Sequence, residues 1–213
     1  IYIGQPPLYK IKQGKQEHYL KDDMELNDYL LARALDNASL QFDPDAPSLG
    51  AEALESLMRD YLSSQLAINR LAKRYDRVFL EHLVDYKRFS TDWDAAEMTA
   101  WAEPLEGLLN DASPASVRFR LEIAPGEEGN EIVLNRYNHG VEHARRLGSE
   151  FWNGPEYRLI GKLAETLHGL VQDGAVVRRG KSEQEIVSFG EAYDCLMAES
   201  LKGRSIQRFK VLG

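Results

Sequence analysis

The sequence predicts an α+β fold that is rich in helices and contains at least one antiparallel sheet. Several segments repeat apolar residues at spacings of three and four, the period of an amphipathic helix, and the longest of these segments runs from Leu54 to Tyr75. After Pro114 the period changes to two, because apolar and charged residues alternate over residues 117–123. This alternation is typical of a half-buried strand, and an antiparallel partner is expected at residues 132–137.

Short strands and one helix are expected before the long helix. β-Branched and aromatic residues predict three strands, at residues 1–3, 8–11 and 18–20. Asp22 and Asp23 then begin a helix whose apolar residues lie three or four positions apart. Turn-forming residues between 37 and 50 indicate a loop, which surrounds a short strand at residues 39–42.

Two further helices are expected between the long helix and the strand pair. One covers residues 78–86, and the other begins after Ser90-Thr91-Asp92, whose side chains can cap it. Pro104 should end or kink that helix before residues 105–109 continue. The remaining elements are a helix from Gly154 to about residue 170, a strand at 175–178, a helix at 188–201 and a strand at 205–212.

Composition limits the class of protein. The chain has 213 residues, of which 34 are acidic and 26 basic, and its net charge is −8. Its single cysteine, Cys195, cannot form an intrachain disulfide, which favours a reducing compartment. No apolar run approaches the length that spans a bilayer, and no secretory leader begins the chain. We therefore expect a soluble, cytoplasmic protein with no membrane partner.

The charges are distributed unevenly along the chain. Residues 1–21 have a net charge of +3 and residues 202–213 a net charge of +4, so residues 22–201 hold −15. Basic ends around an acidic middle indicate that the ends contact a polyanion, while much of the middle does not. The alternative is a pair of solvated termini, since four like charges are a weak signal for nucleic acid.

The sequence contains no self-sufficient active site. It has no phosphate-binding glycine loop of the Walker or dinucleotide type and no G-x-S-x-G nucleophile elbow. Residues His139 to His143 match the zinc-peptidase pattern H-x-x-E-H, which requires a helix. Gly140 and Val141 are poor helix formers, so a polar turn is the favoured interpretation, and a zinc hydrolase is the minor alternative.

Both ends of the chain resemble one protein family. Residues 2–10 read YIGQPPLYK and are followed by Gly14-Lys15, and residues 205–213 read SIQRFKVLG. These segments resemble, in the same order, parts of the TOPRIM region of the gyrase B family of type IIA topoisomerases. About 170 residues, from Asp36 to Gly203, lie between them, and this arrangement is similar to the large insert of the family's Gram-negative members. The resemblance implies three parts: residues 1–35 as the C-terminal part of TOPRIM, 36–203 as a helix-rich insert domain with an antiparallel sheet, and 204–213 as a return strand.

The resemblance also implies a function for a longer parent protein. Members of this family supercoil DNA negatively, using ATP and Mg²⁺, in a heterotetramer with the gyrase A protein. The carboxylates that bind Mg²⁺ would precede Ile1, and the catalytic tyrosine belongs to gyrase A. We therefore expect no catalytic residue, no metal site and no activity of this chain alone.

Four basic residues at the ends are the expected DNA contacts: Lys10, Lys12, Arg208 and Lys210. Lys10 and Lys210 match family lysines beside the cleaved DNA, where they would neutralise backbone phosphates. Val211 is a departure, because the family has glycine there and valine does not readily adopt the positive φ that glycine permits.

Two hypotheses remain for the acidic middle. In the first, the insert is a buttress that docks on TOPRIM and on neighbouring elements and couples their movements. In the second, it is an autonomous DNA-binding module that uses the basic ends together with local basic faces, such as Arg118 with Arg120 on the alternating strand, or residues 178–181. The net charge of −15 favours the buttress, because most of such a surface repels DNA.

Overall fold

The structure is a computed structural model that describes residues 7–209. The strand expected at residues 1–3, together with Lys210 and Val211, lies outside this range. The described residues form seven helices and nine strands, which confirms the α+β prediction. They fall into two compact units: unit 1 comprises the described residues up to Met58 and from Val171 onward, and unit 2 comprises Arg59–Leu170.

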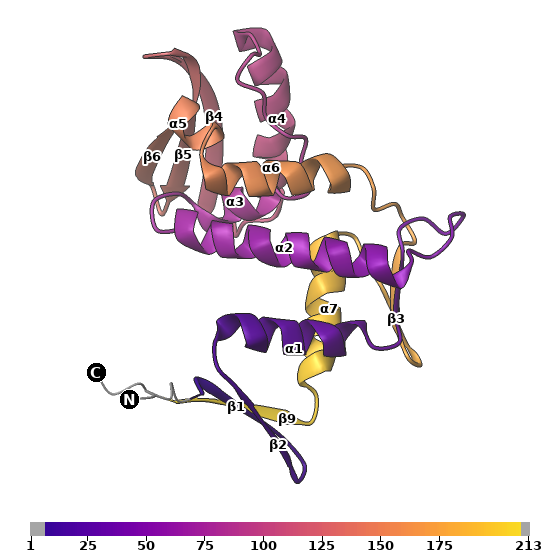
Figure 1. The fold of residues 1–213 in the computed structure, drawn as a ribbon. Coiled ribbons are helices and arrows are strands. Elements are labelled where there is room, and N and C mark those ends of the chain that lie inside the picture. The colour runs from indigo at the N-terminus through magenta and orange to yellow at the C-terminus, as the bar shows by residue number, and fades with distance from the viewer. Residues whose placement is uncertain (1–6, 210–213) are drawn as a thin grey trace. The chain divides into compact units, whose positions relative to one another are not determined.

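Unit 1 contains two three-stranded antiparallel sheets, with strand orders β2-β1-β9 and β3-β7-β8 (Figure 1). Its strands are β1 (Tyr9–Gln13), β2 (Gln16–Leu20), β3 (Ala38–Gln41), β7 (Val176–Arg179), β8 (Ser182–Glu185) and β9 (Arg204–Arg208). Its helices are α1 (Asp23–Leu35) and α7 (Phe189–Leu201), and it also includes the start of α2 (Ala51–Leu71).

The two ends of the chain meet in one sheet. β1 lies in the centre, between β2 and β9, and Tyr9 is paired with Arg208 and Gln13 with Arg204. Burial alternates along β1 because only one face of the strand is covered, and Tyr9 and Ile11 are buried on that face. The N- and C-terminal segments of the described residues are therefore neighbours in one sheet.

Side-chain caps begin both helices of unit 1 where the sequence predicts them. The Asp22 carboxylate accepts a hydrogen bond of 2.9 Å from the backbone N–H of Glu25, and the Ser188 hydroxyl accepts one of 3.2 Å from that of Glu191. The buried residues of α1, which include Leu30, Leu31 and Ala34, follow its helical period, and α1 packs against α7.

Unit 2 contains the rest of α2 and a three-stranded antiparallel sheet of order β4-β5-β6. Its strands are β4 (Val117–Gly126), β5 (Gly129–Asn138) and β6 (Val141–Leu147). Its helices are α3 (Arg77–His82), α4 (Ala95–Asp111), α5 (Ser149–Trp152) and α6 (Pro155–Leu167). The alternating strand and its partner are confirmed, with Leu121 opposite Leu134.

Helix α4 covers the outer edge of β4. The Asn110 amide donates a hydrogen bond of 3.0 Å to the carbonyl of Phe119 and accepts one of 2.8 Å from its N–H, and the Glu106 carboxylate accepts another from the N–H of Leu121. These side chains form hydrogen bonds with backbone N–H and C=O groups that an edge strand otherwise presents to solvent. The opposite edge strand, β6, is exposed at every residue except Leu147.

Aromatic side chains form the centre of unit 2. Phe89 stacks on Trp152, with their ring centroids 4.0 Å apart, and Trp101 packs edge-on against both rings. Tyr157 lies edge-on to Trp152, at 4.8 Å. These four residues are at most 5 % exposed, and burying aromatic side chains stabilises the unit.

Some local expectations were wrong. Asp94, and not Ser90-Thr91-Asp92, caps α4, because its carboxylate and that of Glu97 form a reciprocal capping box. The helix begins at Ala95 and not directly after Asp92, and it continues through Pro104 to Asp111. The strands β6 and β8 were not expected, because both are exposed and lack an apolar alternation.

Candidate nucleic-acid interface

Lys10 and Lys12 lie on the same face of β1, because side chains two positions apart in a strand point to the same side. Lys10 is paired with Tyr19 and Lys12 with Glu17 on β2, so these four side chains share one face of the sheet. The structure thus brings the two expected lysines together, beside one carboxylate and one exposed aromatic ring.

Glu17 partly neutralises this pair of lysines. The Lys10 ammonium is 2.7 Å from a Glu17 carboxylate oxygen and 5.7 Å from the centroid of the Tyr19 ring. The hydrogen bond that Lys10 donates to Glu17 raises the pKa of Lys10, and the same bond lowers the pKa of Glu17. Lys12 is exposed, and within residues 7–209 it forms no ion pair, although its charge also lowers the pKa of Glu17. Lys12 is therefore the better available phosphate contact of the two.

Arg208 lies on the opposite face of this sheet. It is paired with Tyr9, and its guanidinium is 5.8 Å from the centroid of the Tyr9 ring. The Tyr9 hydroxyl in turn donates a hydrogen bond to the Asp23 carboxylate, and this bond raises the pKa of Tyr9. The register therefore separates Arg208 from Lys10, and Lys210 lies outside the described residues.

The exposed face of the β4-β5-β6 sheet holds the second expected pair, Arg118 and Arg120. Both are exposed on one face, as expected, and Arg120 pairs with Glu122 at 2.9 Å. The register places further charges on this face, which are those of Glu131, Glu142 and Arg146. Three arginines are thus matched by three glutamates, so the face has no net charge.

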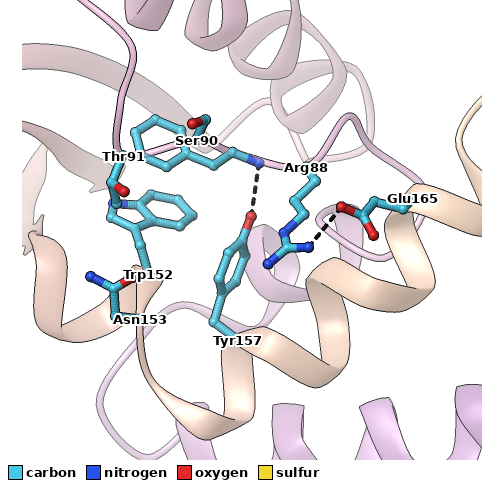
Figure 2. A pocket seen from close by; sticks show the side chains of 8 residues that line it. Arg88, Ser90, Thr91, Trp152, Asn153, Tyr157 and Glu165 are labelled. Atoms are coloured by element: carbon cyan, nitrogen blue, oxygen red, sulfur yellow. Dashed lines mark hydrogen bonds and ion pairs between the residues drawn. The ribbon is translucent and has the colours of Figure 1, made fainter.

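A cavity of about 320 Å³ opens between the loop before α4 and the helices α5 and α6 (Figure 2). The Tyr157 hydroxyl oxygen accepts a hydrogen bond of 2.9 Å from the N–H of Phe89, and burial raises the pKa of Tyr157 to about 12. The Arg88 guanidinium lies 2.7 Å from the Glu165 carboxylate. These contacts attach the loop to α6, which gives the lining side chains a structural role.

The H-x-x-E-H pattern does not form a helix. His139 has a φ of +49° and occupies the turn between β5 and β6, and His143 lies on β6 opposite Arg136. This is the polar turn that the sequence favours. Among the described residues, no group of three or more histidine, cysteine, aspartate and glutamate side chains is placed to hold a metal ion. No described helix has the length and the apolar character needed to span a membrane.

Two family models match the chain. The model described as the DNA gyrase B subunit insert domain matches residues 38–200, and the model described as GyrB, hook, matches residues 7–35. The insert model covers more than half of the 213 residues. The chain belongs to the DNA gyrase B insert-domain family.

Relatives with known names agree with this assignment. The chain is 26 % identical to the DNA gyrase B protein of Rickettsia felis and 29 % identical to that of Rickettsia bellii. It is 27 % identical to the DNA gyrase B protein of Caulobacter vibrioides. Each match covers 100 % of this chain and 25 or 26 % of the relative. The chain therefore spans about a quarter of the length of these gyrase B proteins.

The resemblance found in the sequence to gyrase B of Gram-negative bacteria is confirmed. One group of basic residues is not signalled by the sequence: Lys73, Arg74 and Arg145. Arg74 and Arg145 are 71 positions apart in the chain but in contact in the structure. No local pattern signals this contact, since it depends on where β6 lies relative to the end of α2.

Proposed function

We propose that this chain is the insert-bearing part of a gyrase B protein, which works with gyrase A to introduce negative supercoils into DNA at the expense of ATP. The observation that carries the proposal is the match to the insert-domain model over residues 38–200, next to the hook match over residues 7–35. ATP and Mg²⁺ would act elsewhere in the parent enzyme, in the bacterial cytoplasm. This chain is expected to be inactive alone.

We propose that the insert itself is a buttress without chemistry of its own. Support comes from its surface charges, because exposed arginines of unit 2 pair with carboxylates of the same unit, as Arg88 does with Glu165 and Arg146 with Glu131. Pairing neutralises these arginines, so the surplus of carboxylates in residues 22–201 repels DNA, and such a surface suits docking against protein. The insert would extend over residues 36–203. Residues 1–35 and 204–213 would belong to the TOPRIM region of the parent protein. The small gap between the two matched models, at residues 36 and 37, supports the first of these boundaries.

The face with Lys10 and Lys12 is the proposed DNA contact of the parent domain. Its two lysines project from one strand at a spacing that suits backbone phosphate. The autonomous DNA-binding module that includes Arg118 and Arg120 is the less favoured candidate, because glutamates balance the charge of that face.

The test is negative supercoiling by the complete gyrase B protein mixed with gyrase A, with and without residues 36–203. A buttress predicts that the deletion lowers the supercoiling rate while ATP hydrolysis measured without DNA is retained, which controls for folding. An unchanged supercoiling rate after the deletion would refute the buttress.

The double variant Lys10→Gln/Lys12→Gln of the complete gyrase B protein tests the proposed DNA contact, and it should weaken DNA binding.

A further inference from the structure

The cavity between the loop before α4 and the helices α5 and α6 contains an ion pair that is open to solvent (Figure 2). The Arg88 guanidinium lies 2.7 Å from the Glu165 carboxylate, and the two side chains are 40 % and 56 % exposed. With a volume of about 320 Å³, the cavity is at the lower limit of small-ligand sites, roughly 300 Å³. The polar residues that line it, and that define what we call the Arg88 cavity, are Arg88, Ser90, Thr91, Asn153, Tyr157 and Glu165.

Gly161 in α6 provides the space in which the Arg88 side chain lies. A methyl group on Gly161 would be 3.1 Å from Nε and 3.3 Å from Cδ of Arg88, so the arginine crosses the helix where a side chain is missing. Gly161 lies inside α6 and does not have a positive φ, so its backbone conformation does not require glycine. Glycine inside a helix is destabilising relative to alanine. The fold therefore fixes the guanidinium of Arg88 at a cost in helix stability.

Several polar groups of the Arg88 cavity have unused hydrogen-bonding capacity. The Tyr157 hydroxyl accepts the N–H of Phe89 but donates to no described group, although Tyr157 is only 3 % exposed. A buried O–H without an acceptor is unfavourable. Among the described residues, the side chains of Thr91 and Asn153 form no hydrogen bond, and only one nitrogen of the Arg88 guanidinium has a partner. The cavity thus offers several donors to an anionic oxygen group.

The charges beside the Tyr157 hydroxyl are one cation and one anion. Figure 2 shows the guanidinium of Arg88 between the Tyr157 ring and Glu165. Burial raises the pKa of Tyr157 to about 12, so the hydroxyl keeps its proton at neutral pH and can donate it. Arg88 and Glu165 are the only charged residues that line the cavity, so its lining has no net charge. A simple anion would be attracted by Arg88 but repelled by Glu165, whereas a ligand that carries both charges suits both side chains.

We propose that the Arg88 cavity binds a free α-amino acid in its zwitterionic form. The carboxylate of the ligand accepts hydrogen bonds from Arg88 and from the Tyr157 hydroxyl, and its ammonium donates to Glu165. An exposed ion pair contributes little to stability, so Arg88 and Glu165 separate at small cost when the ligand replaces each partner. Thr91 and Asn153 are left to contact a short polar side chain. The inference goes beyond the buttress and does not depend on it.

The experiment measures binding of L-serine to the isotopically labelled 213-residue chain by two-dimensional nuclear magnetic resonance. Amide signals of residues 88–91 and 152–157 should shift, with a Kd of about 1 mM, as expected for so small a ligand. Two analogues separate the charges of the ligand. N-acetyl-L-serine lacks the ammonium and L-serine methyl ester lacks the carboxylate, and each should bind at least about tenfold more weakly.

Variants of the chain test the two charged side chains. Arg88→Gln and Glu165→Gln should each weaken the binding of L-serine at least about tenfold. The matched control is Arg77→Gln, which breaks the exposed ion pair with Glu81 on α3 and should bind within about twofold of the original chain. Far-ultraviolet circular dichroism verifies that each variant is folded.

Gly161→Ala is a second test, because it removes no charge. The added methyl group displaces the Arg88 side chain, so L-serine should bind at least about threefold more weakly. Thermal unfolding should show no loss of stability, since alanine is the better helix former. This combination separates a disturbed binding site from a disturbed fold.

Several results would overturn the proposal. They are no signal shift at about 10 mM L-serine, and equal weakening of binding in Arg88→Gln and in the Arg77→Gln control. Binding of N-acetyl-L-serine as tight as that of L-serine would also overturn it, and would indicate an anion site. Unchanged binding in Gly161→Ala would contradict the positioning of Arg88 by α6. None of these results bears on the buttress, which the supercoiling assay tests separately.

Discussion

Asp85 is a carboxyl whose ionisation the fold opposes. Burial raises its pKa to about 6, although the nearby His82 acts in the other direction. An unfolded aspartate has a pKa of about 3.9, so the folded state holds this proton more tightly than the unfolded state does. Asp85 therefore lowers the stability of the fold progressively as the pH rises from about 4 to about 6, and the full cost persists above that range.

The substitution Asp85→Asn should remove this cost. We expect the variant to be more stable than the original chain at a pH of about 7.5, by up to about 3 kcal/mol, and to differ little from it at a pH of about 4. Urea unfolding at the two pH values measures the difference. A free energy gain of the same size at both would contradict the account, because the gain would then not come from ionisation.

Tyr157 provides the acceptor for a buried backbone amide. Its hydroxyl oxygen receives the N–H of Phe89, and both residues are at most 5 % exposed. Tyr157→Phe should lower the free energy of unfolding by about 1 to 3 kcal/mol, because the amide is left buried without a partner. The matched control is Tyr137→Phe, which removes an exposed hydroxyl paired with Glu142 and should change stability by less than about 0.5 kcal/mol. Chemical denaturation measures the unfolding free energy of both variants. Equal losses in the two would contradict the role of the Tyr157 hydroxyl as the partner of the buried amide.

At the scale of elements, the N-terminus of α4 allows a direct test of the corrected cap. Asp94 and Glu97 form the capping box, each accepting a hydrogen bond of 2.9 Å from the backbone N–H of the other. Asp94→Ala should cost about 1 kcal/mol of unfolding free energy. Asp92→Ala, at the position that the sequence pattern favours, should cost less than about 0.5 kcal/mol. Thermal unfolding of the two variants measures both losses. A larger loss in Asp92→Ala than in Asp94→Ala would show that Asp92 caps the helix, as the sequence pattern predicts.

The sheet registers decide which basic residues can act together. Lys10 and Lys12 share a face because they are two positions apart, but Arg208 is paired with Tyr9 and projects to the other side. A shift of one residue in the pairing of β1 with β9 would reverse this grouping. Grouping these residues by their place in the sequence therefore could not show which of them share a surface.

At the scale of the whole molecule, unit 1 depends on two distant parts of the chain. Residues 171–213 supply β9 as the partner of β1, β7 as the partner of β3, and α7 as the helix against which α1 packs. Unit 2, in contrast, is one continuous segment from Arg59 to Leu170. The two units should therefore respond differently to truncation.

A chain shortened to residues 1–170 tests this difference. Backbone amides in α1, and those of β1 that bond to β9, should lose their protection against hydrogen exchange because α7 and β9 are gone, while those in β5 should stay protected. Mass spectrometry of exchanged peptides reports both regions in one sample. Retained protection in α1, or its loss in β5, would contradict the division into two units.

Much of the fold could be predicted because its signals are local. The apolar spacing within α2, the alternation of β4, and the start of α1 after Asp22 each depend on residues a few positions apart. The edge strands β6 and β8 were missed because pairing with a neighbour, and not an apolar pattern of their own, makes them strands. The start of α4 differs from the prediction because Asp94, three residues after Thr91, forms the capping box with Glu97.

The sequence by itself determined the family, the α+β class, and the two basic ends with an acidic middle. These properties are recorded in the order of residues along the chain. Only the tertiary structure decided which charges are available, since it pairs Lys10 with Glu17 and balances the Arg118 face with glutamates. It also brings Arg74 to Arg145 across 71 positions. The physical reason is that electrostatic attraction depends on distance in space, which the register of strands and the packing of helices determine.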